Sequence, residues 1–142
     1  MSLKPLLGQR ALITGGSKGI GGGIASKLAS LGCQVTLMSR NINNLKTKVH
    51  ELNNEYPNNE EHQWHSFDLK CSYDLESFLK TNIQYEKINI LINCAGQSQK
   101  RLLVSTSIDE ISSITNVNLI SPMILCKLFA RSMSKTKSTK HL

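Results

Sequence analysis

A glycine-rich stretch near the start of the chain, "ITGGSKGIGGGIA" at residues 13–25, constrains the fold more than any other feature. It follows a short apolar run, "RALIT" at residues 10–14, and leads into residues 20–31, whose apolar positions have helical spacing. Gly32 comes directly after this run and is a typical C-terminal helix cap. The stretch therefore predicts a buried strand, a tight turn and a helix, in that order.

Apolar runs alternate with amphipathic runs along the rest of the chain. The patterns predict strands at residues 10–14, 34–39, 62–68 and 88–93, and helices at residues 20–31, 43–56 and 73–85. A further helix is predicted to begin at Ser107, where Glu110 completes a capping box. Because strands that alternate with helices form parallel sheets, we expect an α/β fold in one domain over residues 1–142. This would be a Rossmann-like, doubly wound parallel sheet of about four strands with flanking helices.

The spacing of three glycines predicts a phosphate-binding turn. Gly15 allows the tight turn, Gly19 lets the backbone approach a pyrophosphate, and Gly21 lets the helix and the strand pack closely. The start of the helix adds free N–H groups and a partial positive charge. The sequence therefore predicts a dinucleotide site, and a purely structural glycine turn is the alternative.

The end of the second predicted strand bears on which dinucleotide is bound. Sites for NAD carry an acidic residue there, which binds the ribose hydroxyls. This chain has Ser39 and Arg40 instead, and Lys18 in the glycine stretch is expected near the same ribose. A ribose phosphate would meet two cations and a hydroxyl, with about 1.5–3 kcal/mol from each charge-assisted hydrogen bond. NADP(H) is therefore the predicted cofactor, unless Arg40 and Lys18 are solvated surface charges.

Composition argues against several other classes of ligand. The net charge is +7, but the one Trp, three Tyr and three Phe are not interleaved with the basic residues, so we do not expect nucleic acid binding. No apolar run approaches the roughly 20 residues that span a bilayer, so no membrane partner is expected. His62 and His65 fall on opposite faces of a predicted strand, and the cysteines lack ligand spacing, so no metal site is expected.

Several motifs resemble those of the short-chain dehydrogenase/reductase family. Thr14–Gly21 matches its TGxxxGxG, "FDL" at 67–69 resembles the end of its third strand, and "NCAG" at 93–96 resembles its NNAG, with Cys94 as a departure. In the family, the counterpart of Asp68 binds the adenine amino group. The resemblance implies cofactor contacts from Thr14, Gly15, Ser17, Lys18, Gly19, Ile20, Gly21, Ser39, Arg40, Asp68, Leu69, Asn93, Ala95 and Gly96.

Asn118, at the end of "NVN", resembles the catalytic asparagine of the same family. Pro122 lies four residues later and has no N–H, so the carbonyl of Asn118 loses its helical partner and the helix is expected to kink there. In the family this carbonyl binds the water of a proton relay. A simple helix irregularity is the alternative.

A more specific resemblance is to the 3-oxoacyl-[acyl-carrier-protein] reductases, above all those of fungal mitochondria. The segments "INILINCAG", "LLVST" and "NVNLISPMILCKLFARSM" carry it, with Ser105 where these reductases commonly have arginine. It implies NADPH-dependent reduction of 3-oxoacyl-[acyl-carrier-protein] in fatty acid synthesis, in the mitochondrial matrix or alternatively the cytoplasm. It also implies homo- or hetero-oligomers that pack through Ile120, Ile124 and Leu128, with Met123 and Phe129 beside them. Carrier protein is expected to dock on Arg131, Lys135, Lys137 and Lys140, unless these form a solvated tail.

The acid–base residues of the family do not all appear in the chain. Its chemistry also uses a serine, and a tyrosine with a lysine four residues later. The residues at that place are Glu60 after Tyr56, Ser77 after Tyr73 and Asn89 after Tyr85. We therefore expect the cofactor half of a reductase, without the C-terminal strands and inactive alone. The alternatives are a non-catalytic NADP-binding module, a regulatory subunit of a mixed reductase oligomer, or a reductase of another carbonyl substrate.

Overall fold

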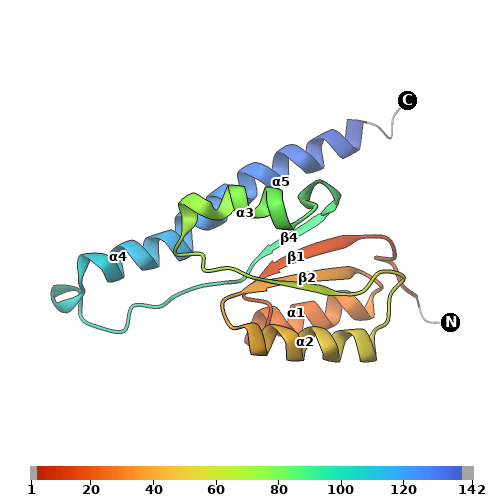
Figure 1. Cartoon of the computed structure of the whole chain (residues 1–142), viewed down its shortest axis with the longest axis horizontal. Helices are drawn as coiled ribbons and strands as arrows, with labels where there is room; N and C mark the ends of the chain where they lie inside the picture. The colour runs from red at the N-terminus through yellow and green to blue at the C-terminus, as the bar shows by residue number, and fades with distance from the viewer. Residues whose placement is uncertain (1–2, 139–142) are drawn as a thin grey trace.

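Four parallel strands form the sheet of the computed structural model, which describes residues 3–138, with side chains described as far as residue 135. The strands are β1 Arg10–Thr14, β2 Gln34–Ser39, β3 Gln63–Ser66 and β4 Ile90–Asn93. Their order across the sheet is β3-β2-β1-β4, and every neighbouring pair is parallel (Figure 1). This arrangement confirms the predicted Rossmann-like sheet.

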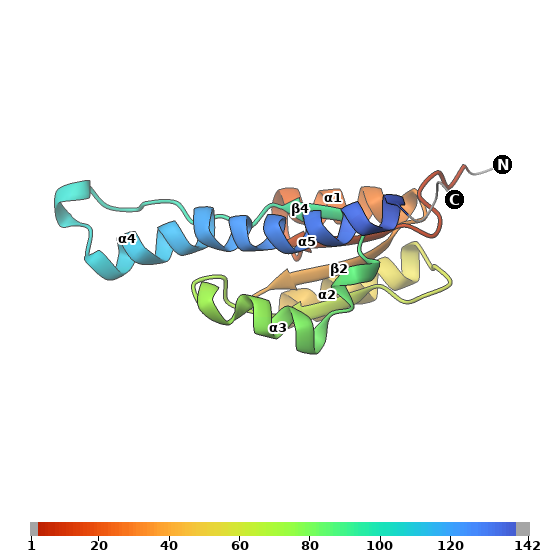
Figure 2. The ribbon, with the colours of Figure 1, turned by 90° about the horizontal axis from the view of Figure 1, so that it is seen from above.

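Helices cover both faces of the sheet, as a doubly wound fold requires. Helices α1 Gly19–Ser30 and α2 Ile42–Glu55 lie on one face, and α3 Leu75–Asn82 and α5 Ser121–Ser138 lie on the other (Figures 1 and 2). Helix α4 Ile108–Thr115 leads into α5 through a π-helical turn, η4 Asn116–Ile120. The remaining short turns are η1 Ser72–Asp74, η2 Tyr85–Lys87 and η3 Leu103–Ser105.

Two apolar clusters, one on each face, hold the layers together. Ala11 and Ile13 of β1 pack in the cluster formed with α1 and α2, whereas Leu12 packs with α3 and α5. All three side chains are fully buried. Burial of a leucine or isoleucine side chain stabilises the fold by about 1.5–3 kcal/mol. The central strand is therefore apolar on both sides, which explains its continuous apolar run.

The predicted element boundaries are right for β1 and β2 and wrong for the third helix. The helix expected over residues 73–85 is split, because α3 ends at Asn82 and η2 begins only at Tyr85. Ile83 between them has an extended backbone, with φ −130° and ψ 130°, and its side chain is buried in the core. Core packing of this one side chain thus ends the helix, which local helical spacing did not indicate.

The strands expected over 62–68 and 88–93 are shorter than predicted, spanning Gln63–Ser66 and Ile90–Asn93. The predicted caps are confirmed at two helix ends. Gly32, one residue past the C-cap Leu31 of α1, has φ +93°, and the Ser107 hydroxyl accepts the N–H of Glu110 at 3.2 Å. Helix caps can therefore be predicted from the local sequence. The residue at which a strand ends depends instead on its hydrogen bonds to the neighbouring strand.

The sequence predicts a helix kink near Asn118, and the structure has a π-helical turn there. The N–H of Ser121 donates to the carbonyl of Asn116, five residues earlier, and α5 continues directly after it. Such single π-helical turns occur inside α-helices, and the helical stretch continues through Pro122 without a break. Residues 108–135 form the one helical stretch of the described chain that is long and apolar enough to cross a membrane by length and composition. Part of its apolar character serves packing, since Leu125, Leu128 and Phe129 lie in the core.

The expected subunit-facing stripe on α5 is wrong in part. Leu128 and Phe129 are buried in the core of the chain itself, because α5 lies against the sheet and η2. Met123 of the predicted surface is exposed, and Leu119 in the π-helical turn is exposed as well. For the predicted carrier-protein surface, Arg131 and Lys135 lie on α5, whereas the side chain of Lys137 and the whole of Lys140 fall outside the described residues.

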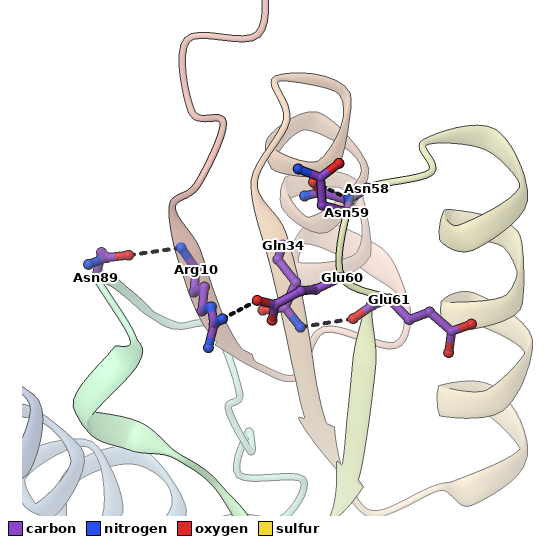
Figure 3. A network of polar contacts seen from close by, with 7 residues as sticks. All are labelled: Arg10, Gln34, Asn58, Asn59, Glu60, Glu61 and Asn89. Carbon is purple, nitrogen blue, oxygen red and sulfur yellow. Dashed lines mark hydrogen bonds and ion pairs between the residues drawn. The ribbon is translucent and has the colours of Figure 1, made fainter.

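Polar contacts tie the amino ends of the strands together (Figure 3). The Arg10 side chain pairs with Glu60, and its main-chain N–H donates to the Asn89 side chain at 3.0 Å. The Gln34 side chain donates to the carbonyl of Glu61 at 2.9 Å. These contacts join the segment before β3 and the segment before β4 to the two central strands.

His62 completes this end of the sheet as a buried, neutral imidazole. Its Nδ1 accepts the N–H of Val35 at 3.1 Å, so the proton must sit on Nε2, which lies 2.9 Å from the carbonyl of Tyr56. Burial lowers the pKa of His62 below its ordinary value of 6.5, against the opposing effect of the Tyr56 carbonyl. Burial also lowers the pKa of His65 below its ordinary value.

We expect the free energy of unfolding to fall as the pH is lowered from 6.5 through the folded-state pKa of His62. The unfolded chain binds more protons than the folded chain in this range, so acid favours unfolding, whereas the full contribution is present above pH 6.5. Urea unfolding at several pH values measures the slope. His62→Asn should flatten this slope in part, since the lowered pKa of His65 still contributes. His50→Asn, at an exposed site, is the matched control. An identical slope in His62→Asn and the unmodified chain would contradict this assignment.

Candidate functional site

A cleft of about 700 Å³ lies where the carboxyl ends of the four strands meet. In an open parallel sheet, ligands bind outside these ends, where successive connections leave toward opposite faces. Here that point falls between β1 and β4. The cleft is lined by Gly15, Ser17, Lys18, Gly19, Met38, Ser39, Arg40, Asn41, Asn44, Phe67, Asp68, Leu69, Cys94, Ala95, Gly96, Gln97 and Val117.

The glycine turn is packed tightly from behind and open toward the cleft. Gly15 has φ +66°, and a Cβ added to it would lie 2.9 Å from the backbone of Ala95. A Cβ on Gly21 would lie 2.3 Å from the carbonyl oxygen of Gly15, so α1 packs closely against the glycine turn at this residue. Nothing lies within 4 Å of the corresponding position at Gly19.

The start of α1 points free N–H groups at this open space. Lys18 occupies the N-cap position without a side-chain cap, and the first turn of α1 contains no acidic residue among the described residues. The first N–H groups of a helix have no acceptor within it and favour a nearby anion. The turn and the helix start therefore fit the pyrophosphate of a dinucleotide.

Thr14 links the glycine turn to the loop after β4. Its hydroxyl accepts the N–H groups of Cys94 at 3.1 Å and Ala95 at 3.2 Å, and lies 3.5 Å from the carbonyl of Ile92. The residue is buried, and it does not line the cleft. Thr14 therefore shapes the site through the backbone that it holds.

The end of β2 forms the cationic part of the cleft. The Ser39 hydroxyl donates to the Ser17 hydroxyl at 3.2 Å, which joins the strand end to the glycine turn. Arg40 and Lys18 are both exposed and line the same cleft. An anionic group placed there would meet two cations and two hydroxyls.

Two side walls face each other across the cleft. The first, residues 67–69, follows β3, and in it a carboxylate oxygen of Asp68 accepts the N–H of Lys70 at 3.0 Å. The second, residues 94–97, follows β4 and is held by Asn118. The Asn118 side chain accepts the N–H of Gln97 and donates to its carbonyl, both at 2.8 Å. The predicted role of the Asn118 main-chain carbonyl remains a prediction.

Most of the sequence-predicted contacts come together in this cleft, and four do not line it. Thr14 and Gly21 are buried behind the turn, and Ile20 is exposed at the start of α1. Asn93 ends β4 with its side chain donating to the Cys126 sulfur at 3.4 Å. Lining residues that the sequence reasoning missed are Met38, Asn41, Asn44, Phe67, Cys94, Gln97 and Val117. Asn41 and Asn44 follow Arg40 closely, but Val117 comes from a distant helix and has no local signal.

Comparison with known proteins points in one direction. The family model described as short chain dehydrogenase matches residues 9–140. The human 3-oxoacyl-[acyl-carrier-protein] reductase is 29% identical over 122 residues, which are 85% of this chain and 49% of the relative. The 3-oxoacyl-[acyl-carrier-protein] reductase of Chlamydia muridarum is 31% identical over 140 residues, and the match covers 94% of this chain and 53% of the relative.

A solved structure shows the same relationship. A metagenomic short-chain oxidoreductase in complex with NADP superposes with a TM-score of 0.81 at 32% identity, covering 93% of this chain and 58% of that one. The chain thus spans about half the length of the curated relatives that it matches.

Two glycine-to-alanine variants test the packing of the turn. We expect Gly21→Ala to destabilise the fold by about 1–3 kcal/mol, because its Cβ has no room beside the Gly15 carbonyl. The added Cβ should also displace the glycine turn, which should weaken dinucleotide binding. Gly23→Ala is the matched control on the same helix, where nothing lies within 4 Å and alanine should stabilise by about 0.5–1 kcal/mol. Thermal unfolding and calorimetric titration measure both effects, and equal behaviour of the two variants would refute the close-packing argument.

Proposed function

This chain belongs to the short chain dehydrogenase family, and on that premise we propose that it binds NADP(H) as the cofactor-binding part of a 3-oxoacyl-[acyl-carrier-protein] reductase. The observation that carries the cofactor choice is the cationic end of the cleft. Arg40 and Lys18 line it beside the paired hydroxyls of Ser39 and Ser17. The metagenomic oxidoreductase described above was solved with NADP, which supports the same choice.

Each part of the cleft has a proposed task. N–H groups of the glycine turn and of the α1 start bind the pyrophosphate, and the Asp68 carboxylate in the first wall accepts a hydrogen bond from the adenine amino group. Arg40, Lys18 and Ser39 bind the ribose phosphate. When bound, NADPH supplies a hydride for carbonyl reduction. The main-chain carbonyl of Asn118 holds a water that relays a proton.

The substrate proposal rests on the relatives. The human and Chlamydia proteins are named as reductases of 3-oxoacyl groups carried by acyl carrier protein. We propose the same class of substrate here, delivered by acyl carrier protein. Association into homo- or hetero-oligomers is part of this proposal, and the exposed side chains of Leu119 and Met123 support it as a contact surface.

The chain should bind NADPH at least about tenfold more tightly than NADH, because only NADPH carries the ribose phosphate that pairs with Arg40 and Lys18. Arg40→Asp should reverse the preference, since a carboxylate repels the phosphate and accepts hydrogen bonds from the free ribose hydroxyls. Lys127→Asp, an equal change of charge on α5 outside the cleft, should preserve the preference. Calorimetric titration gives the dissociation constants, and equal affinities in the unmodified chain would exclude the phosphate clamp.

The 142-residue chain alone should not reduce an acetoacetyl thioester with NADPH at a measurable rate. It contains no tyrosine with a lysine four residues later, and a positioned general acid contributes about 10²–10⁴-fold to such a step. Loss of NADPH absorbance measures turnover, with a full-length relative as the positive control. Turnover close to that of the relative would show that another group in the chain supplies the proton.

A further inference from the structure

We propose that the π-helical turn and the serine after it set the spacing of the two side walls of the cleft, with Ser121 as the positioning residue for the first wall. This inference rests on the proposed binding of NADP(H). The first wall is residues 67–69 after β3, and the second is residues 94–97 after β4. Both are loops, and the same short helical segment contacts both.

Ser121 holds the first wall directly. Its side chain is fully buried, and its hydroxyl donates to the carbonyl of Leu69 at 2.7 Å. Its main-chain N–H donates to the carbonyl of Asn116 and closes the π-helical turn. One residue therefore ties the geometry of the turn to the position of a loop that lies 52 residues earlier in the chain.

A second buried contact joins the same loop to the same turn. The Ser72 hydroxyl donates to the side-chain oxygen of Asn116 at 3.0 Å, and Ser72 is almost completely buried. Ser72 follows the first wall by only three residues. Hydrogen bonds between buried groups hold position strongly, because neither partner has water as an alternative.

The opposite side of the turn holds the second wall. Asn118 makes two hydrogen bonds to the backbone of Gln97, and the Ser113 hydroxyl donates to the Gln97 side chain at 2.9 Å. Asn116 and Asn118 are two residues apart, which places them on nearly opposite sides of a helix. Val117 between them lines the cleft itself.

The two walls belong to different halves of a dinucleotide site. Strands β1, β2 and β3 form one side of the switch point, so the wall after β3 faces the adenine half of the ligand. The wall after β4 lies across the switch point and faces the other half. Loss of the contacts that hold the first wall should therefore weaken binding of the adenine half. Loss of the contacts that hold the second wall should weaken binding of the adenine half less.

The test uses two probes, NADPH and adenosine 2′,5′-bisphosphate, which contains only the adenine half. We expect Ser121→Ala to weaken both probes by a similar factor of about ten, as for one lost buried hydrogen bond. Asn118→Ala should weaken NADPH more than it weakens the bisphosphate. Ser112→Ala, at an exposed serine on α4, is the matched control and should bind both probes like the unmodified chain.

Urea unfolding of each variant separates positioning from simple loss of stability. A folded Ser121→Ala variant that binds the bisphosphate with unchanged affinity would overturn this inference and leave the proposed function intact. If Ser121→Ala does not fold, Ser72→Ala removes the second tie to the same loop and carries the same expectation. If the unmodified chain binds neither probe, the proposed function fails and this inference fails with it.

Discussion

The contact between the glycine turn and the loop after β4 is the constraint on which the candidate site depends. Gly15 comes so close to the backbone of Ala95 that a single added carbon would lie 2.9 Å from it. The Thr14 hydroxyl fixes the same approach with hydrogen bonds to two successive N–H groups of that loop. With this approach in place, the turn, the start of α1 and the second wall surround one space.

The two apolar clusters make that approach durable. Alternate residues of β1 are buried against different helices, so the strand cannot shift by one residue without exposing both clusters. Helix α5 contributes Leu125, Leu128 and Phe129 to the cluster on its own face. The same helical stretch carries the π-helical turn that contacts both walls, so packing of the core and shape of the cleft are coupled through it.

Much of the site was predictable because its determinants are local. A few neighbouring residues are enough to predict each of them: a glycine at a left-handed turn, a strand that ends in Ser39 and Arg40, and Asp68 after the third strand. The features that the sequence did not predict depend on residues that are distant in the chain. Val117 enters the cleft from a helix far along the chain, and the Thr14 hydroxyl binds the backbone of the loop after β4 and does not line the cleft. No periodicity or spacing encodes such choices, since they follow from which loops meet in space.

The sequence by itself determined the order of strands and helices, the parallel sheet, the phosphate-binding turn and the absence of an acid at the end of β2. These properties follow from side-chain periodicity, backbone freedom and charge, which act over a few residues. Only the tertiary structure decided that α3 ends before Ile83, that Leu128 and Phe129 face the core, and that Ser121 meets Leu69. Those outcomes depend on burial and on hydrogen bonds between segments that are distant in the chain, because a buried polar or apolar group takes whichever partner the completed fold brings to it.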